Sequence, residues 1–225
     1  MLHSWSIAPS EAVQIQKKLA QMVVRNGDPV SLSYIGGVDL SVNQSTNKAV
    51  AAVVILDYPG LKIVEIEKAR GELGLPYIPG LLSFREAPLI LEACRKTNFT
   101  PQLLIVDGQG IAHPRRMGLA SHLGLFLDIP TIGCAKSPLC GKYNTPSDKA
   151  GDYSEIVDKG EAIGITLRTR AGAKPIYIST GHQISMESAI YWILKCCTGY
   201  RLPQPTRLAH QAAGETMKTG GIMVE

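Results

Sequence analysis

The amino-acid sequence predicts an α/β fold in which one mixed sheet is flanked by helices. Three strand-like segments near the start are separated by turn residues, which is the pattern of an antiparallel meander. Short, wholly apolar strands then alternate with helical patterns, as expected for buried strands. The chain has 225 residues, 45% of them hydrophobic, which is enough for one sizeable core. We therefore expect a single domain spanning residues 1–225.

The first third of the chain is expected to form one helix and the meander. Residues 10–24 place apolar side chains among polar ones at helical spacing, which predicts an amphipathic helix packed on a surface. Turn-forming residues then separate runs of apolar and β-branched residues. Three strands are expected, at residues 33–39, 49–56 and 62–69.

The rest of the chain is expected to alternate helices and strands. A loop rich in glycine and proline, residues 71–80, precedes a helix that contains Leu89 to Cys94. Further strands are expected at residues 103–107, 131–135, 163–168 and 175–180, and helices at residues 117–127, 186–196 and 206–218. Residues 219–225 are expected to be a flexible tail. A meander followed by helix, strand, helix and strand is the element order of ribonuclease H-like folds.

Composition limits the classes of function. The net charge of +4 is mildly basic, which permits nucleic acid binding without requiring it. The five cysteines have no zinc or disulfide spacing and are expected to be core thiols in a reducing cytosol. No run approaches the roughly 18 apolar residues of a membrane span, and the start has no secretory pattern. We expect a cytoplasmic protein without a membrane partner.

The end of one apolar strand is the most informative segment for function. Residues 103–106 are all apolar, and the strand stops at Asp107, followed by Gly108 and Gly110. Ligands bind at the carboxyl ends of strands in open α/β sheets, so a carboxylate here is placed to hold a metal ion. The alternative is that Asp107 simply opens an Asp-Gly turn.

Three carboxylates are expected to meet if the first and fourth strands are neighbours. Asp39 lies at the end of the first strand, Asp107 at the end of the fourth, and Glu86 at the start of the helix between them. Two like charges ~4 Å apart repel by about 4 kcal/mol at an effective dielectric of 20, so a bound cation would be needed. Oxygen ligands favour Mg²⁺ or Mn²⁺ over zinc. Alternatively, Asp39 is a solvated strand end, and Glu86 completes a capping box with Ser83.

Other polar and aromatic side chains are candidates near this site. Lys136, at the end of the next strand, could orient water or neutralise a phosphate oxygen, or it could simply face solvent. His113 and His210 could act in proton transfer or phosphate binding, or be structural. Two prolines stiffen the loop that presents Tyr77 and Ile78, which suits a wedge in a base stack. The alternative is that Tyr77 folds onto the core.

Several multi-residue segments, in the right order, are similar to those of bacterial endonuclease V, the deoxyinosine 3′-endonuclease family. The resemblance covers nearly the whole chain, from about Gly36 to Arg207. The matching segments are residues 76–80, 82–86, 106–108, 113–118, 133–136, 139–142 and 199–203.

The resemblance implies a ribonuclease H-like nuclease that requires Mg²⁺, for which Mn²⁺ substitutes. Such an enzyme nicks the second phosphodiester bond 3′ of deoxyinosine and leaves a 3′-hydroxyl and a 5′-phosphate. The implied metal ligands are Asp39, Glu86 and Asp107, with Lys136 and His210 as further catalytic residues. The implied substrate-binding residues are Tyr77, Ile78, Arg85, Gly108, Gly110, Ile111, His113 and Arg116.

The chain departs from the family pattern at two positions. Gln109 stands where many bacterial relatives have histidine, and aspartate is an alternative where His210 stands. Neither position belongs to the acidic trio. The expected partner is inosine-containing DNA, single- or double-stranded, bound by a monomer. Two other functions stay open at this point: an inosine-specific ribonuclease of the same fold, and a non-catalytic nucleic acid binding module.

Overall fold

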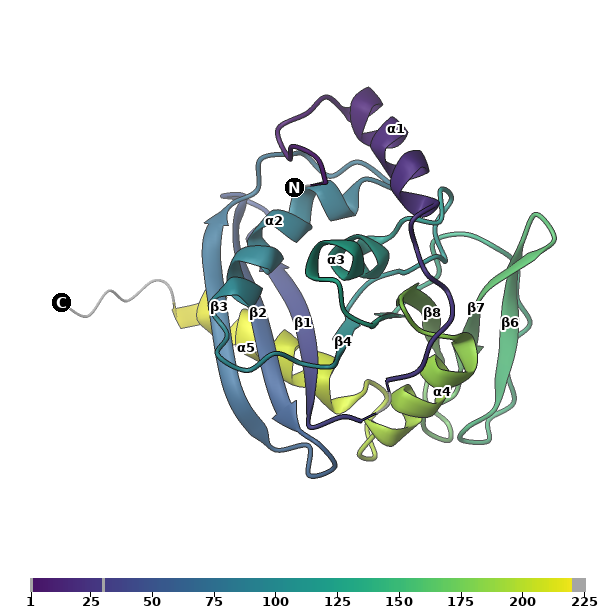
Figure 1. Ribbon diagram of the computed structural model, residues 1–225. Helices are drawn as coiled ribbons and strands as arrows, with labels where there is room; N and C mark the ends of the chain where they lie inside the picture. Colours follow the sequence, from purple (N-terminus) through teal and green to yellow (C-terminus); the bar gives the residue numbers. More distant parts are fainter. Residues whose placement is uncertain (1, 30, 220–225) are drawn as a thin grey trace.

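The computed structural model describes residues 2–29 and 31–219 as helices, strands and connecting loops (Figure 1). The strands are β1 (Tyr34–Val42), β2 (Lys48–Asp57), β3 (Ile63–Glu72), β4 (Leu103–Val106), β5 (Thr131–Ala135), β6 (Tyr153–Asp158), β7 (Glu161–Leu167) and β8 (Ile176–His182). The helices are α1 (Pro9–Ala20), α2 (Leu82–Arg95), α3 (Leu119–Leu127), α4 (Met186–Lys195) and α5 (Gln204–Thr219).

All eight of these strands form one mixed sheet. Its order is β3-β2-β1-β4-β5-β8-β7-β6. The first three strands pair antiparallel as a meander, whereas β1, β4 and β5 run parallel. The predicted fold class, including the adjacency of the first and fourth strands, is confirmed.

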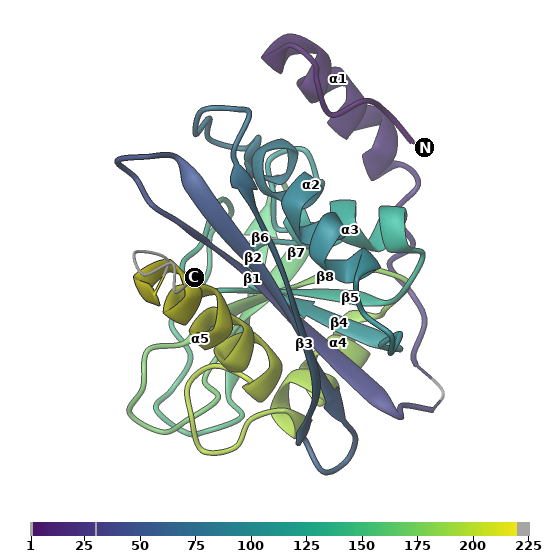
Figure 2. The ribbon, with the colours of Figure 1, turned by 90° about the vertical axis from the view of Figure 1, so that its left-hand side faces the viewer.

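Helices cover both faces of the sheet, as Figure 2 shows: α2 and α3 lie on one side, and α4 and α5 on the other. Side chains along a strand alternate between the two faces. In β1, Ile35 accordingly packs with residues of α4 and α5, and Val38 packs with residues of α2 and α3. Because helices cover both faces of the sheet, β2 and β4 consist of consecutive apolar residues rather than alternating apolar and polar ones.

Gly37 allows α5 to lie unusually close to β1. A Cβ atom built on Gly37 would collide with the backbone of Pro205, at the start of α5. The helix therefore crosses directly over the strand that carries Asp39. Asp39 is two residues after Gly37, so its side chain points to the same face of the sheet, toward α5.

The structure corrects two details of the predicted elements. Strand β6 was not expected, because it is an edge strand in which only Ile156 is buried and the apolar signal is weak. Helix α1 ends at Ala20 rather than at residue 24, since Val24 instead exchanges hydrogen bonds with the end of β8 through His182 and Gln183. The predicted tail lies, from residue 220 onward, outside the described residues.

Within residues 2–29 and 31–219, no helix is long and apolar enough to cross a membrane.

Candidate metal centre

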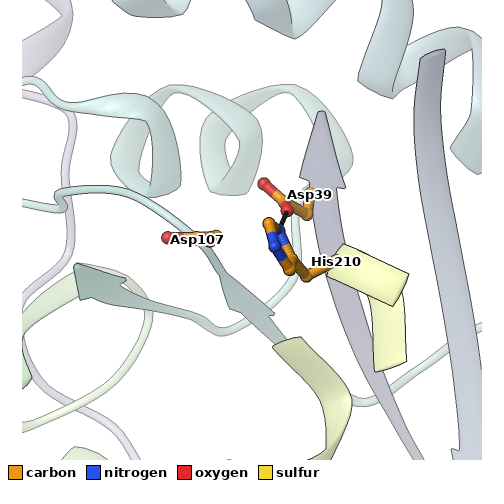
Figure 3. A group of neighbouring side chains, drawn as sticks. All are labelled: Asp39, Asp107 and His210. Carbon is orange, nitrogen blue, oxygen red and sulfur yellow. Dashed lines mark hydrogen bonds and ion pairs between the residues drawn. The ribbon is translucent and has the colours of Figure 1, made fainter. Parts of the chain in front are cut away.

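Three side chains with metal-ligating atoms meet where β1 and β4 run parallel (Figure 3). Asp39 lies in β1, Asp107 directly follows β4, and His210 lies in α5. The pairing of Val38 with Val106 places the two aspartates next to each other at the carboxyl side of that pair. One ligand atom of each residue lies within 4.8 Å of the others. Segments far apart in the sequence thus converge on one point.

Hydrogen bonds and ion pairs hold these side chains in place. His210 Nδ1 lies 2.5 Å from Asp39 Oδ2, and Lys136 Nζ lies 2.5 Å from Asp107 Oδ2. Lys136 directly follows β5, and Arg201 donates a hydrogen bond of 3.0 Å to its backbone carbonyl. The Asp39 side chain is only 11% exposed and that of Asp107 12%. Asp39 is therefore not a solvated strand end.

Burial and mutual repulsion disfavour the negative charges at this site. Burial, followed by the charge of Asp107, raises the pKa of Asp39, although His210 and Lys136 act in the opposite direction. Burial, followed by the charge of Asp39, raises the pKa of Glu86 to about 8. Asp107 raises the pKa of Glu86 as well, so all three acids contribute to one negative potential. A cation bound here would offset this negative potential.

The structure places Glu86 beside the cluster rather than within it. The group of mutually close ligand atoms contains His210 and the two aspartates, whereas Glu86 interacts with both aspartates through its charge. A capping box does not explain Glu86, because α2 starts at Leu82 with no side-chain cap. Ser83 Oγ instead lies 3.0 Å from His122 Nδ1, inside the core.

The donor set fits a hard divalent cation. Two carboxylates and one imidazole nitrogen converge, a third carboxylate lies close by, and no cysteine belongs to the group. Carboxylate oxygens suit Mg²⁺ and Mn²⁺. Burial and the neighbouring carboxylates raise the pKa values of Asp39 and Glu86, and a bound cation would favour their ionised forms.

A pocket of about 310 Å³ opens next to the metal-ligating cluster. Its lining includes Asp107, Lys136, Gly108 and Gln109, so it adjoins the centre directly. Tyr77 stands at the same pocket with 63% of its surface exposed, which excludes the alternative that it folds onto the core.

Ile78 differs from the expectation of an exposed residue beside Tyr77. It is half-buried and packs with a small apolar cluster that includes Ala12 of α1, Leu81 and Phe84. Its side chain anchors the loop, because it faces α1 rather than solvent.

The glycine-containing segment after β4 forms one wall of the pocket. Gly108 lines the pocket, whereas Ile111 is buried and the Gly110 N–H donates to Ser179 Oγ at 2.8 Å. His113 also lines the pocket, and burial lowers its pKa to about 4. His113 is therefore a neutral ring at neutral pH rather than a proton-transfer group.

The structure does not bring the two expected arginines into this pocket. Arg116 forms ion pairs with Asp158 at 2.9 Å and Glu161 at 2.6 Å, on the β6–β7 hairpin. Arg85 donates to Asn47 at 3.0 Å and lines a different cavity, although its charge lowers the pKa of Glu86. Both arginines thus donate hydrogen bonds to carboxylate or amide oxygens of this chain, outside the pocket.

Sequence reasoning missed two residues that support the pocket. Gln16 is fully buried and contacts both the loop that carries Tyr77 and the segment that carries His113, while Arg201 secures the backbone of Lys136. A signal for Gln16 was present, because Ala12 and Leu19 are buried on the same face of α1. A glutamine at a core position of a helix needs buried hydrogen-bond partners.

Comparisons with known proteins agree with one another. The family model described as Endonuclease V matches residues 17–211. A relative named Endonuclease V from Gloeobacter violaceus is 50% identical over 212 residues, which are 93% of this chain and 86% of the relative. The crystal structure of the Endonuclease V from Streptomyces avermitilis superposes with a TM-score of 0.92 at 35% identity, covering 97% of each chain.

A third solved structure contains a bound nucleic acid. It is the Endonuclease V of Ciona intestinalis in complex with a 24mer DNA that contains an inosine followed by a ribo-adenosine. It is 29% identical to this chain with a TM-score of 0.83, and the match covers 93% of this chain and 98% of that one.

Proposed function

Because this chain belongs to the endonuclease V family of DNA-cleaving nucleases, we propose that it is a deoxyinosine 3′-endonuclease of DNA repair. It would hydrolyse the second phosphodiester bond 3′ of deoxyinosine and leave a 3′-hydroxyl and a 5′-phosphate. This proposal rests on one observation: the metal-ligating cluster directly adjoins a pocket of about 310 Å³. A phosphate held at the cluster would lie within one or two nucleotides of a base held in the pocket.

Asp39, Asp107 and His210, with Glu86 beside them, are the residues that would hold the metal ion. When bound, Mg²⁺, or Mn²⁺ in its place, supplies the positive charge that makes a phosphate diester susceptible to attack by water. Asp39 also fixes the ring of His210 through their 2.5 Å contact. That contact presents the imidazole and the carboxylate on one side of the site.

Lys136 is proposed to act on the scissile phosphate. Its ammonium group lies 2.5 Å from Asp107 and has 39% of its side chain exposed, so it faces both the acid and the solvent-open side. An ammonium there can donate a hydrogen bond to a non-bridging phosphate oxygen and offset the charge that develops during attack. Arg201 keeps the Lys136 backbone in place for this contact.

The pocket is proposed to receive the extruded hypoxanthine base. The inosine-containing DNA bound by the Ciona relative supports this choice of substrate. Of the segment from Gly108 to Ile111, Gly108 and Gln109 line this pocket and would contact the base through their backbone. His113 would form a neutral wall, and Tyr77 would fill the gap left in the stack. Inosine pairs poorly, so its extrusion from a duplex costs less than that of a normal base. Arg85 adds positive charge beside Glu86.

A nicking assay tests the proposed function directly. The unaltered protein with Mg²⁺ should cut only the inosine strand of a duplex with a single central inosine, at the second bond 3′ of the lesion. Excess EDTA should abolish the product. A duplex with adenine in place of inosine is the matched control, and an RNA of the same sequence tests the ribonuclease alternative. Faster cleavage of the RNA, or equal cleavage of the adenine duplex, would contradict the proposal.

Replacing Tyr77 by alanine should impair selection of inosine more than the chemical step. Base–aromatic stacking contributes roughly 1–3 kcal/mol, so we expect the ratio of kcat/KM for inosine over adenine duplexes to fall by about tenfold. Steady-state nicking of both duplexes measures this ratio. Tyr153→Ala, at another exposed tyrosine (50%) on edge strand β6, is the control and should leave this ratio unchanged. An unchanged ratio in Tyr77→Ala would exclude a wedge role for Tyr77.

We also propose a cytoplasmic location, where chromosomal DNA would be accessible to such an enzyme. The five cysteines are all free thiols, which agrees with a reducing compartment. A fusion to a fluorescent protein that reports outside the cytoplasm would contradict this proposal.

A further inference from the structure

Gln16 connects the first helix to the loop that carries Tyr77. Its side chain is 0% exposed, yet every polar atom of its amide has a partner. The amide nitrogen donates to the carbonyl oxygens of Gly80 at 2.9 Å and Met117 at 3.2 Å, and the amide oxygen accepts from Arg115 Nε at 2.5 Å. One residue of α1 thus joins the segments on both sides of the pocket.

The carbonyl of Gly80 is the point on which these contacts converge. Besides Gln16, Arg115 Nη2 donates to it at 2.7 Å and His113 Nε2 lies 3.0 Å away. His113 Nδ1 accepts from the backbone N–H of Arg115 at 3.1 Å, so the ring proton must be on Nε2, which therefore donates to Gly80. Three donors on one carbonyl fix its position and direction strongly.

Gly80 is the third residue of the turn that follows Tyr77. The N–H of Leu81 donates to the carbonyl of Ile78 at 2.9 Å, with Pro79 and Gly80 as the central residues. Gly80 has a φ of 78°, as the third position of a type II turn requires. A Cβ atom there would lie 2.6 Å from Arg115 Nη2, so a larger residue would have to displace the end of that side chain.

Helix α1 supports the other side of this loop through apolar contacts. Ala12 belongs to a small buried cluster against which Leu75 and Ile78 pack, on either side of Tyr77. Tyr77 itself makes no such contact with the core and remains 63% exposed. The loop is therefore held at its flanks, and its aromatic tip is left free at the pocket.

We propose that Gln16 is a positioning residue that sets the specificity of the enzyme by holding the Tyr77 loop against the pocket. This inference rests on the proposed function, because it assigns to α1 a part in base extrusion. Gln16 belongs neither to the metal-ligating cluster nor to the lining of the base pocket, but it donates to two lining residues, Gly80 and Met117. It therefore acts from behind the pocket wall, through Gly80 and the Tyr77 loop. Without it, Tyr77 would sample many orientations and fill the base stack less often.

The test compares double-stranded with single-stranded inosine substrates. Extrusion from a duplex needs the wedge, whereas a base in a single strand is already unpaired. Gln16→Ala and the nearly isosteric Gln16→Met should therefore lower kcat/KM for the inosine duplex by about tenfold, the usual scale for losing a buried hydrogen-bond partner, and change it little for the single strand. Gln14→Ala, at an exposed glutamine of the same helix, is the matched control.

A double variant shows whether Gln16 acts through Tyr77. Combining Gln16→Met with Tyr77→Ala should give the same duplex-to-single-strand ratio as Tyr77→Ala alone, since one contact cannot be lost twice. Equal losses on both substrates, or additive losses in the double variant, would overturn the proposal and leave Gln16 a purely structural residue.

Hydrogen exchange tests, without relying on activity, whether Gln16 holds the Tyr77 loop in place. In the free protein, the amides of Tyr77, Ile78 and residues 80–84 should exchange about tenfold faster in Gln16→Met than in the unaltered protein or in Gln14→Ala. Unchanged exchange rates in Gln16→Met would overturn the proposal that Gln16 holds this loop. If the unaltered protein did not nick inosine at all, the proposed function would fail together with the part of Gln16 in specificity. The exchange experiment would still decide whether Gln16 holds the loop.

Discussion

Asp107→Asn is expected to abolish metal-dependent nicking while leaving the fold and lesion binding intact. Asparagine keeps the shape of the side chain but removes the charge that pairs with Lys136 at 2.5 Å and that would bind the cation. We expect the single-turnover nicking rate on an inosine duplex to fall by about 10³-fold or more, as for residues that act as one catalytic unit. Binding of the same duplex, measured in Ca²⁺ by fluorescence anisotropy, should change by less than about threefold.

Asp148→Asn is the control for this experiment. Asp148 also pairs with a basic side chain, Arg168, but it is 83% exposed, so its ion pair contributes little. Nicking at the normal rate by Asp107→Asn would show that the carboxylate is not needed, and the metal centre would then have to be placed elsewhere.

Glu86→Gln should separate activity from stability. The unfolded chain ionises Glu86 at its ordinary pKa of 4.5, whereas the folded chain resists ionisation until about pH 8. The folded state therefore binds more protons between these values, and its stability falls as pH rises from 4.5 to 8. Glutamine at position 86 carries a neutral amide at every pH, so Glu86→Gln removes this loss of stability. At pH 8 in EDTA, the free energy of unfolding should rise by on the order of 2 kcal/mol, and nicking in Mg²⁺ should fall at least about 10²-fold.

Denaturant titration at pH 4.5 and pH 8 measures the stability effect. The two proteins should be nearly equal at the lower pH, where Glu86 is protonated in the folded state and only half ionised in the unfolded state. Glu155→Gln, at an exposed glutamate of β6, is the control and should show no such pH dependence. A variant less stable than the unaltered protein at pH 8 would mean that the Glu86 carboxylate is already compensated by positive charge.

The two aspartates could be placed from the sequence for a physical reason. Asp107 directly follows the apolar strand β4, whereas Asp39 lies within β1, which continues to Val42 beyond its predicted end at Asp39. Both strands are apolar enough to be placed inside a sheet, and ligands bind near the carboxyl ends of such strands. The fold then brings Asp39 and Asp107 together through the parallel pairing of β1 with β4. Lys136 follows the next parallel strand and reaches the same place.

Other parts of the site depend on contacts that no local pattern encodes. The position of His210 follows from the crossing of α5 over Gly37, which involves residues far apart in the chain. Gln16 has its partners 64 and 101 positions away, so its spacing indicates burial but not what it binds. Strand β6 was missed because an edge strand with exposed polar residues lacks the apolar signal on which strand prediction depends.

The contact between α5 and β1 has a consequence for the protein during its synthesis. His210 joins Asp39 across 171 positions of the sequence. A polypeptide still emerging from the ribosome carries both aspartates long before the last helix exists. The centre is therefore completed only after residue 210 has been synthesised, so a nascent chain that stops before this position would hold both aspartates without their histidine partner.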